Sequence, residues 1–323
     1  MKNIPSPSFR RVATIDIGSN TIKSLVLQGP LPGTVVHQET REVRISEGIS
    51  GNPPRLAEAS MVHGAETVAE LVETMRTFAP EAIQIAATSA VRDATNQADF
   101  SRLIRERTGI ELRILSGAEE AAAIGTGILH EPLLEGCAGA TVSDLGGGSL
   151  EVVGLRARSP FFADSFQVGS VRFLERFVEN PKAPLSKTVM AQVMQSTLDT
   201  LSSPLREAGL HRIVTHVGTG GSFTIARNIL AHRAGLSLED FDPKLPLDTL
   251  VALRDELADL SLAERLEIPG LPSGRADVLP IALTIVEGLG EVLETDRFLH
   301  SLCNLRRGLA SAMLTARHFH FGG

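Results

Sequence analysis

Three glycine-rich turns are the parts of this sequence best suited to binding phosphate. They are Gly18-Ser19-Asn20, the run Gly146 to Ser149, and the run Gly218 to Ser222. Glycine leaves backbone N–H groups unshielded, so a phosphate can approach them closely. The third turn also opens a predicted helix, whose N-terminal dipole favours an anion. The predicted phosphate ligands are Ser19, Asn20, Gly146, Gly147, Gly148, Ser149, Gly220, Gly221 and Ser222.

Three carboxylates accompany the first two turns: Asp16, Asp144 and Glu151. They would repel a bound phosphate unless a cation lay between them, and their oxygen atoms suit magnesium or a similar hard divalent ion. We expect these three residues to hold Mg²⁺ together with oxygen atoms of the substrate. Two other interpretations stay open at this point. Asp144 could simply cap its turn, and Glu151, which alternates with apolar neighbours, could face solvent.

A pair of adjacent acids, Glu119 and Glu120, opens another predicted helix. Ser116 with Glu119 three residues later forms a capping box, which gives Glu119 a structural role. Glu120 then projects about 100° further round the helix, toward the cleft, where it could deprotonate a water molecule. Arg92 follows a predicted strand and could grip phosphate with its guanidinium, although an ion pair with Asp93 is the alternative.

The turns differ from two better-known nucleotide-binding loops. The sequence contains no Gly-Lys dipeptide, so the lysine-bearing P-loop is absent. Phe223 occupies the last glycine position of a dinucleotide-binding fingerprint. Other architectures for phosphate binding must therefore be considered.

Composition predicts a globular protein without a nucleic-acid or membrane partner. With 323 residues, 43% of them hydrophobic, the chain is long enough for two buried cores. The net charge of −7 and the lack of a Lys/Arg run give no general attraction to nucleic acid or anionic lipid. The N-terminus lacks the apolar core of a secretory signal, and apolar stretches such as 82–87 are shorter than the ~20 residues of a membrane span. We expect a cytoplasmic protein, with Cys137 and Cys303 as buried thiols.

The arrangement of predicted strands repeats. A strand at 12–17 runs into the first acidic turn and resumes at 22–27, and a strand at 140–145 runs into the second and resumes at 150–155. This repetition suggests two related lobes. Strands alternate with predicted helices, which implies a mixed sheet in each lobe, covered by helices. The other expected elements are strands at 35–45, 83–87, 111–115, 212–217 and 298–303, and helices at 55–78, 99–108, 223–232 and 276–293, with further helices starting at 116, 171, 186 and 306.

At these residues the sequence resembles the exopolyphosphatase and guanosine pentaphosphate phosphohydrolase family. The matching segments, in the family's order, are IDIGSNTIKSLV, TSAVRDATN, ILSGAEEAAAIGTG, SDLGGGSLEVV, VGTGGSFTIA, RADVLP and LRRGL. Two departures are Leu150, where a small hydroxyl residue is usual, and Ile281-Ala282, which replaces a common glycine. The chain has no His-Asp dipeptide, so it resembles the short, two-domain form of the family.

The resemblance implies an α/β fold of two actin-like, ribonuclease H-like domains with a substrate cleft between them. The expected domains are 1–125 plus 305–323, and 126–304, because the last helix of such folds packs back on the first domain. The resemblance further implies that Glu120 is the water-activating base and Arg92 a phosphate ligand. It matches Asp144 and Glu151 to the metal-binding and catalytic acids, and it makes a homodimer typical.

The preferred hypothesis is therefore an exopolyphosphatase, which releases terminal phosphates from inorganic polyphosphate with the help of magnesium. Three alternatives stay open. The same constellation would serve a guanosine pentaphosphate 5′-phosphohydrolase, and the two-lobe layout also serves actin-like ATPases and sugar kinases. The third alternative is a non-catalytic protein that senses such phosphorylated ligands.

Overall fold

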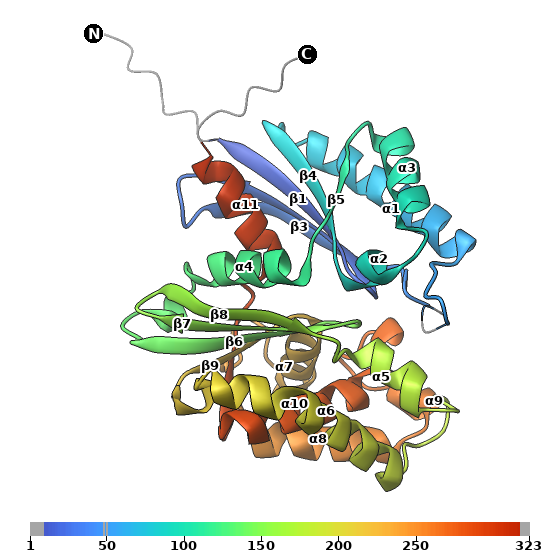
Figure 1. Cartoon of the computed structure of the whole chain (residues 1–323), viewed down its shortest axis with the longest axis vertical. Coiled ribbons are helices and arrows are strands. Elements are labelled where there is room, and N and C mark those ends of the chain that lie inside the picture. Colours follow the sequence, from blue (N-terminus) through green and yellow to red (C-terminus); the bar gives the residue numbers. More distant parts are fainter. Residues whose placement is uncertain (1–9, 48, 50, 317–323) are drawn as a thin grey trace.

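The computed structural model describes residues 10–316 except 48 and 50. Two β-sheets, each with its own helices, lie one above the other along the long axis of the molecule (Figure 1). We call them the first and second lobes. The division into the two predicted domains stays a prediction, and the segments 1–9 and 317–323 of the first lie outside the described residues.

The first lobe is built on a five-stranded sheet in the order β3-β2-β1-β4-β5. Strands β1 to β3 form an antiparallel meander, while β4 and β5 run parallel to β1. Its strands are β1 (Arg11–Ile17), β2 (Thr21–Gln28), β3 (Thr34–Glu42), β4 (Ala82–Ala87) and β5 (Leu112–Ile114). The helices that follow in this part of the chain are α1 (Glu58–Arg76), α2 (Ser89–Asp93), α3 (Gln97–Thr108) and α4 (Gly117–Ile128).

The second lobe is built on a six-stranded sheet in the order β10-β11-β9-β6-β7-β8. Its strands are β6 (Gly139–Leu145), β7 (Leu150–Arg156), β8 (Ser159–Phe166), β9 (His216–Thr219), β10 (Lys244–Pro246) and β11 (Arg297–His300). Its α-helices are α5 (Ser170–Phe177), α6 (Lys187–Glu207), α7 (Gly221–Arg233), α8 (Leu247–Asp259), α9 (Leu262–Arg265) and α10 (Leu279–Leu293). Short 3₁₀ turns are η1 (Pro132–Leu134), η2 (Leu210–Arg212) and η3 (Ser273–Arg275).

The predicted repetition of the two lobes is confirmed. In each, an antiparallel hairpin is joined on one side by a third strand and on the other by a parallel strand. The central order β3-β2-β1-β4-β5 of one sheet therefore matches β8-β7-β6-β9-β11 of the other. Mixed sheets flanked by helices were expected of two actin-like domains, and this fold class is what the structure has.

Helix α11 (Leu305–Thr315) ends the described chain and lies beside the first sheet, as predicted (Figure 1). It packs on β1, β2 and α4. Two glycines permit this close helix contact. A Cβ on Gly127 would lie 2.4 Å from the carbonyl oxygen of Asn304, and one on Gly308 would lie 1.8 Å from that of Ala123. The tight α4–α11 contact fixes α4, which carries Glu120.

Several elements differ from the sequence prediction. Strand β8 and helices α8 and α9 were not predicted, and the strand expected at 212–217 begins only at His216. Strand β8 forms the edge of its sheet, and most of its residues are exposed. An edge strand tolerates Pro160 and polar residues, so it carries little of the apolar alternation by which strands are recognised.

Candidate functional site

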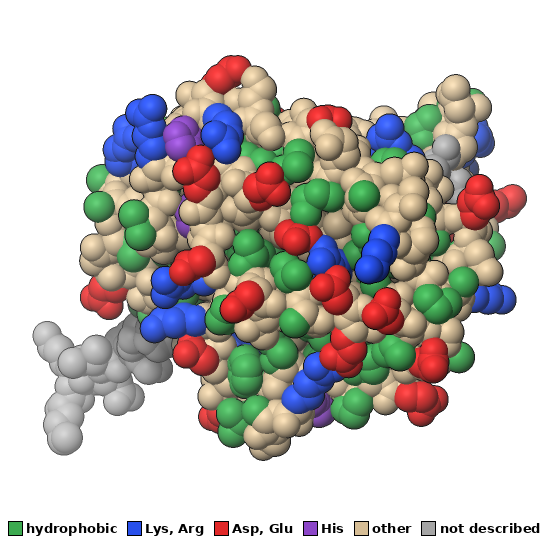
Figure 2. Space-filling model, turned by 90° about the horizontal axis from the view of Figure 1, so that it is seen from below, with side chains coloured by type: hydrophobic (Ala, Val, Ile, Leu, Met, Phe, Trp, Pro, Cys, Tyr) green, Lys and Arg blue, Asp and Glu red, His purple; other side chains and the backbone are tan. Residues whose placement is uncertain are grey.

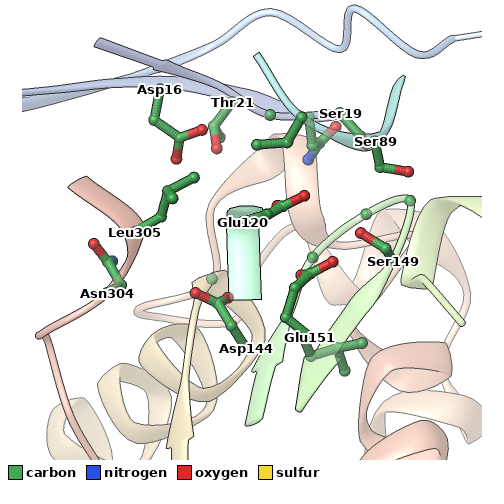
Figure 3. A pocket seen from close by; sticks show the side chains of 18 of the residues that line it. Asp16, Ser19, Thr21, Ser89, Glu120, Asp144, Ser149, Glu151, Asn304 and Leu305 are labelled. Carbon is green, nitrogen blue, oxygen red and sulfur yellow. The ribbon is translucent and has the colours of Figure 1, made fainter. Parts of the chain in front are cut away.

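The two acidic turns face each other across a cavity between the lobes (Figure 3). Asp16, Ser19 and Thr21 project from the first lobe, and Asp144 and Glu151 from the second. Figure 3 also shows Glu120 between the two groups. The cavity has a volume of about 60 Å³ and is partly open to solvent. One water molecule needs roughly 10–15 Å³ of such space, so the cavity has room for a small group such as one phosphoryl.

Both turns have the same backbone geometry. Each spans four residues, and the first N–H donates to the carbonyl of the fourth, over 3.1 Å from Gly18 to Thr21 and 3.0 Å from Gly146 to Ser149. A phosphate could therefore meet two equivalent turns, one from each lobe.

The second turn is oriented by helix α5. The carbonyl of Gly146 accepts from the N–H of Ser170, and that of Gly147 accepts from the N–H of Val171 over 2.9 Å. The carbonyl of Gly148 accepts from the Arg172 side chain over 2.8 Å. In a trans peptide the N–H points opposite to the C=O. The N–H groups that follow these carbonyls therefore point away from α5, in a loop that lines the cavity.

Glu120 is positioned by the helix start that the sequence predicted. The Ser116 hydroxyl accepts from the N–H of Glu119, and the Glu119 carboxylate accepts from the N–H of Ser116, so the capping box is confirmed. This leaves Glu120 buried against the cavity. Burial, and then the charge of Glu151, raise the pKa of Glu120 well above its usual range. A carboxylate with a raised pKa is a better proton acceptor.

Arg92 lies behind Glu120 and does not line the cavity. Its Nη1 donates to Oε2 of Glu120 over 2.8 Å and to the carbonyl of Leu115 over 3.0 Å. Its Nε also lies 3.9 Å from Oδ1 of Asp93, so the alternative ion pair is present as well. Arg92 therefore orients the carboxylate of Glu120, while its contact with phosphate stays a prediction.

Of the acids of the second turn, Glu151 is buried and Asp144 is partly buried. Only 2% of Glu151 is exposed, which excludes the solvent-facing interpretation, and its Oε1 accepts from the Ser165 hydroxyl over 2.6 Å. Burial raises the pKa of Glu151 to about 7 and that of Asp144 to about 6. Burial also raises the pKa of Asp16.

The third glycine turn supplies a wall of the site. Gly220 has a left-handed φ of 92°, and a Cβ there would lie 2.3 Å from Oδ1 of Asp144, so only glycine fits. Gly221 lines the cavity between the lobes, and Gly220 lines the cavity next to it. We call the first of these the phosphate cavity, after the ligand that the sequence predicts. Ser222 lies apart, because its buried hydroxyl donates to the carbonyl of Leu145 over 3.4 Å. Asn20 lines the cavity, but its side-chain amide donates to the carbonyl of Gly274 over 3.0 Å.

Two cationic side chains of the cavity, Lys23 and Arg275, were missed in the sequence. Lys23 pairs with Asp16 across the first hairpin, as Glu151 pairs with Asp144 across the second. The repeated spacing could have revealed Lys23. Arg275 lies in the segment RADVLP, which was used only for the resemblance.

The donor set fits a hard cation only if other oxygen atoms complete its coordination. The cavity wall carries four carboxylates against two cationic side chains, and Oδ1 of Asp16 is buried without a hydrogen-bond partner among the described residues. Within residues 10–316, leaving out 48 and 50, no group of three or more His, Cys, Asp and Glu is arranged to hold a metal ion. Water or substrate oxygens would have to supply the remaining ligands.

The face in Figure 2, at the second-lobe end, intersperses acidic and basic side chains. Among the described helices, none has the length and apolar character that a bilayer crossing requires.

Comparisons with known proteins agree with these features. Residues 27–317 match the model of the Ppx/GppA phosphatase family. The chain is 28% identical over 304 residues to a guanosine-5'-triphosphate,3'-diphosphate pyrophosphatase of Vibrio atlanticus. That alignment covers 94% of this chain but 59% of the relative, so the chain spans well under two thirds of the relative's length.

Solved structures share the fold. An exopolyphosphatase from Cytophaga hutchinsonii superposes with a TM-score of 0.85 at 24% identity, covering 94% of this chain and 98% of the other. The Ppx/GppA family member of Aquifex aeolicus gives 0.74 at 21% identity, covering 96% and 100%. At these identities the likeness shows the fold alone.

Proposed function

Because the chain belongs to the Ppx/GppA phosphatase family, we propose that it is an exopolyphosphatase, which hydrolyses the terminal phosphate from inorganic polyphosphate. One observation carries the proposal: a buried carboxylate, Glu120, faces a cavity for one phosphoryl group between two turns of opposite lobes. Amides, two cations and a poised base around one anion form a site for phosphoryl transfer to water.

In the proposed reaction, Glu120 accepts a proton from a water molecule whose oxygen forms the new bond to the terminal phosphorus. The bridging P–O bond breaks, and its electron pair leaves with the shortened chain. Arg92 keeps the carboxylate of Glu120 oriented through its 2.8 Å hydrogen bond. Lys23, Arg275 and the loop amides balance the charge that spreads over the phosphate oxygens.

Magnesium, in this proposal, would be held by Asp144, Glu151 and Asp16 together with oxygen atoms of the substrate. When bound it would neutralise charge on the phosphates. All three carboxylates line the cavity, and Asp16 and Glu151 are buried.

A guanosine pentaphosphate 5′-phosphohydrolase is the second candidate, and one cavity favours it. The neighbouring space shares Lys23 and Arg275 with the phosphate cavity but is also lined by Glu39, Glu42 and Glu239. These carboxylates would repel further phosphates of a long chain. They could instead accept hydrogen bonds from the N–H groups of a base.

The test is a phosphate-release assay on polyphosphates of increasing length and on guanosine pentaphosphate, with and without magnesium. Release from polyphosphate that requires magnesium supports the proposal, and faster release from the nucleotide favours the second candidate. Phosphorylation of an added acceptor by ATP would favour a kinase. Tight binding without release in any divalent ion would identify a sensor.

The proposed setting is the cytoplasm, with no nucleic-acid partner, and the proposed assembly is a homodimer. Cys137 and Cys303 are both free thiols, which suits a reducing compartment. Sedimentation analysis tests the dimer.

A further inference from the structure

A second contact joins the two lobes beside the phosphate cavity, at the loop that precedes α10. Gly274 of this loop receives two hydrogen bonds at its carbonyl, from the side chains of Asn20 and Arg44, each over 3.0 Å. The N–H of Gly274 donates to Oε2 of Glu42 over 3.0 Å. Three side chains of the first lobe thus hold one peptide segment of the second.

An ion pair completes this contact. Nη2 of Arg44 lies 2.5 Å from Oδ1 and 2.7 Å from Oδ2 of Asp277. Asp277 is also the carboxylate near Arg265, a fully buried residue whose two terminal nitrogens find no hydrogen-bond partner among the described residues. Asp277 thus pairs with Arg44 of the first lobe and lies near a buried cation of its own lobe. We call Asn20, Glu42, Arg44, Gly274 and Asp277 the clasp.

The backbone of Arg44 supports a specific role for this contact. Its φ is 49°, in the left-handed region, which is unfavourable for a non-glycine residue. The N–H of Arg44 donates to the carbonyl of Asn20 over 3.0 Å, which ties the strained residue to the first glycine turn. Such strain persists only where the surroundings determine the conformation.

Arg275 lies between two clasp residues, Gly274 and Asp277, in the sequence. Arg275 follows Gly274 directly and precedes Asp277 by two residues, and its guanidinium reaches the phosphate cavity. There its Nη2 lies 3.4 Å from the hydroxyl of Thr21 and 3.2 Å from where a Cβ on Gly221 would stand. Arg275 belongs to the second lobe, yet it touches the turn of the first. Its place therefore depends on how the lobes meet.

We propose that the clasp, and Arg44 in particular, positions the guanidinium of Arg275 in the phosphate cavity and so favours binding of the anion. The inference rests on the proposed function, because it assumes that the cavity binds phosphate. Arg44 lines no part of the phosphate cavity, so it acts through Arg275 and is a positioning residue.

A double-mutant cycle tests the clasp. Tripolyphosphate is the probe, and calorimetry measures its dissociation constant in a Glu120→Gln background that prevents turnover. Arg44→Met should raise the dissociation constant about 10-fold, as expected if the binding-competent population falls to about a tenth. In an Arg275→Met background the same change should have less than about a 2-fold effect, because the residue on which Arg44 acts is gone. Arg44→Lys, which keeps the charge, should restore part of the affinity.

The matched control is Arg233→Met, which removes a guanidinium that pairs with both oxygens of Glu256 within the second lobe. It should leave binding unchanged. The cycle uses Arg44→Met and not Asp277→Asn, because loss of the Asp277 charge beside the buried Arg265 could unfold the protein. The Arg44 side chain is partly exposed, so its replacement should be tolerated. Additive effects of Arg44→Met and Arg275→Met, or unaltered binding by Arg44→Met, would overturn the inference.

Because binding is measured apart from turnover, the two proposals can fail separately. A wild-type protein that binds tripolyphosphate but releases no phosphate would contradict the hydrolase, while the cycle would still decide the role of the clasp.

Discussion

The two acidic hairpins share one backbone design but differ in charge. Asp16 stands opposite Lys23 in the first lobe, and Asp144 stands opposite Glu151 in the second. The first hairpin thus carries its own cation, whereas the second has two acids, of which Glu151 is buried and Asp144 partly buried. The backbone of both turns can meet the anion, but the side chains differ. Lys23 suits an anion, whereas the acid pair of the second hairpin suits a cation that the anion brings with it.

Glu120 stands between these hairpins, and its removal should have the largest effect. Glu120→Gln keeps the size of the side chain but removes the proton acceptor, so kcat should fall about 10³-fold, within the range of general-base catalysis. Tripolyphosphate binding should change little. Steady-state phosphate release and calorimetry measure the two effects.

The neighbouring Glu119→Gln is the matched control, because glutamine also completes a capping box and Glu119 lies on the other side of the helix start. Equal rate losses in the two variants would show that Glu120 has only a structural role.

The buried Glu151 of the second hairpin should make stability depend on pH. The pKa of Glu151 is raised from 4.5 to about 7, so the folded state binds this proton more tightly than the unfolded state. The stabilisation that protonated Glu151 gives to the folded state is complete below about pH 4 and is lost as the pH rises through 7. With 1.36 kcal/mol per pKa unit, the loss is ~3 kcal/mol.

Denaturant unfolding of wild type and Glu151→Gln between pH 4 and 8, without divalent cations, measures this difference. As the pH rises, the free energy of unfolding of Glu151→Gln should increase relative to that of wild type, because the variant has no carboxyl group to ionise here. A difference that does not vary with pH would contradict the account of this hairpin.

The cation of the first hairpin should contribute to binding. Lys23→Met removes a positive charge that lines the cavity, so KM should rise about 10-fold, the equivalent of ~1.4 kcal/mol, with a smaller change in kcat. Lys244→Met, at an exposed position of β10, is the control. A loss confined to kcat would assign Lys23 to the chemical step instead.

The smallest expected effect concerns the cap of α4. Ser116→Ala should lower the free energy of unfolding by ~1 kcal/mol and reduce kcat a few-fold, because the helix start that aims Glu120 loosens. Ser186→Ala removes the equivalent cap of α6 and should cost similar stability. Its kcat should equal that of wild type, and a matching decrease would indicate a general effect of stability.

The sequence could predict what depends on local signals. The glycine turns, the capping box at Ser116 and the repeated hairpins are visible there, and with them the positions of Glu120 and Asp144. Lys23 was overlooked, although it occupies in the first hairpin the position that Glu151 occupies in the second. Comparing the two repeats would have revealed its positive charge. Edge strand β8 was missed because Pro160 and exposed residues mask its period.

Long-range contacts were beyond sequence reasoning. Arg92 was expected to bind phosphate, but only the fold shows that its Nη1 donates to Glu120 across 28 positions. The clasp joins Arg44 to Asp277, which are 233 positions apart. Neither pairing has a local signature, because each depends on how separate elements pack.

The most direct test of the account is a crystal structure with a non-hydrolysable imido analogue of tripolyphosphate and magnesium. The account predicts that the terminal phosphate contacts the turn at Gly147 and Gly148 together with the turn at Ser19. The carboxylate of Glu120 should lie within reach of one water molecule from the phosphorus. An analogue bound to only one turn, or outside the cleft, would contradict the claim that both lobes hold a single anion.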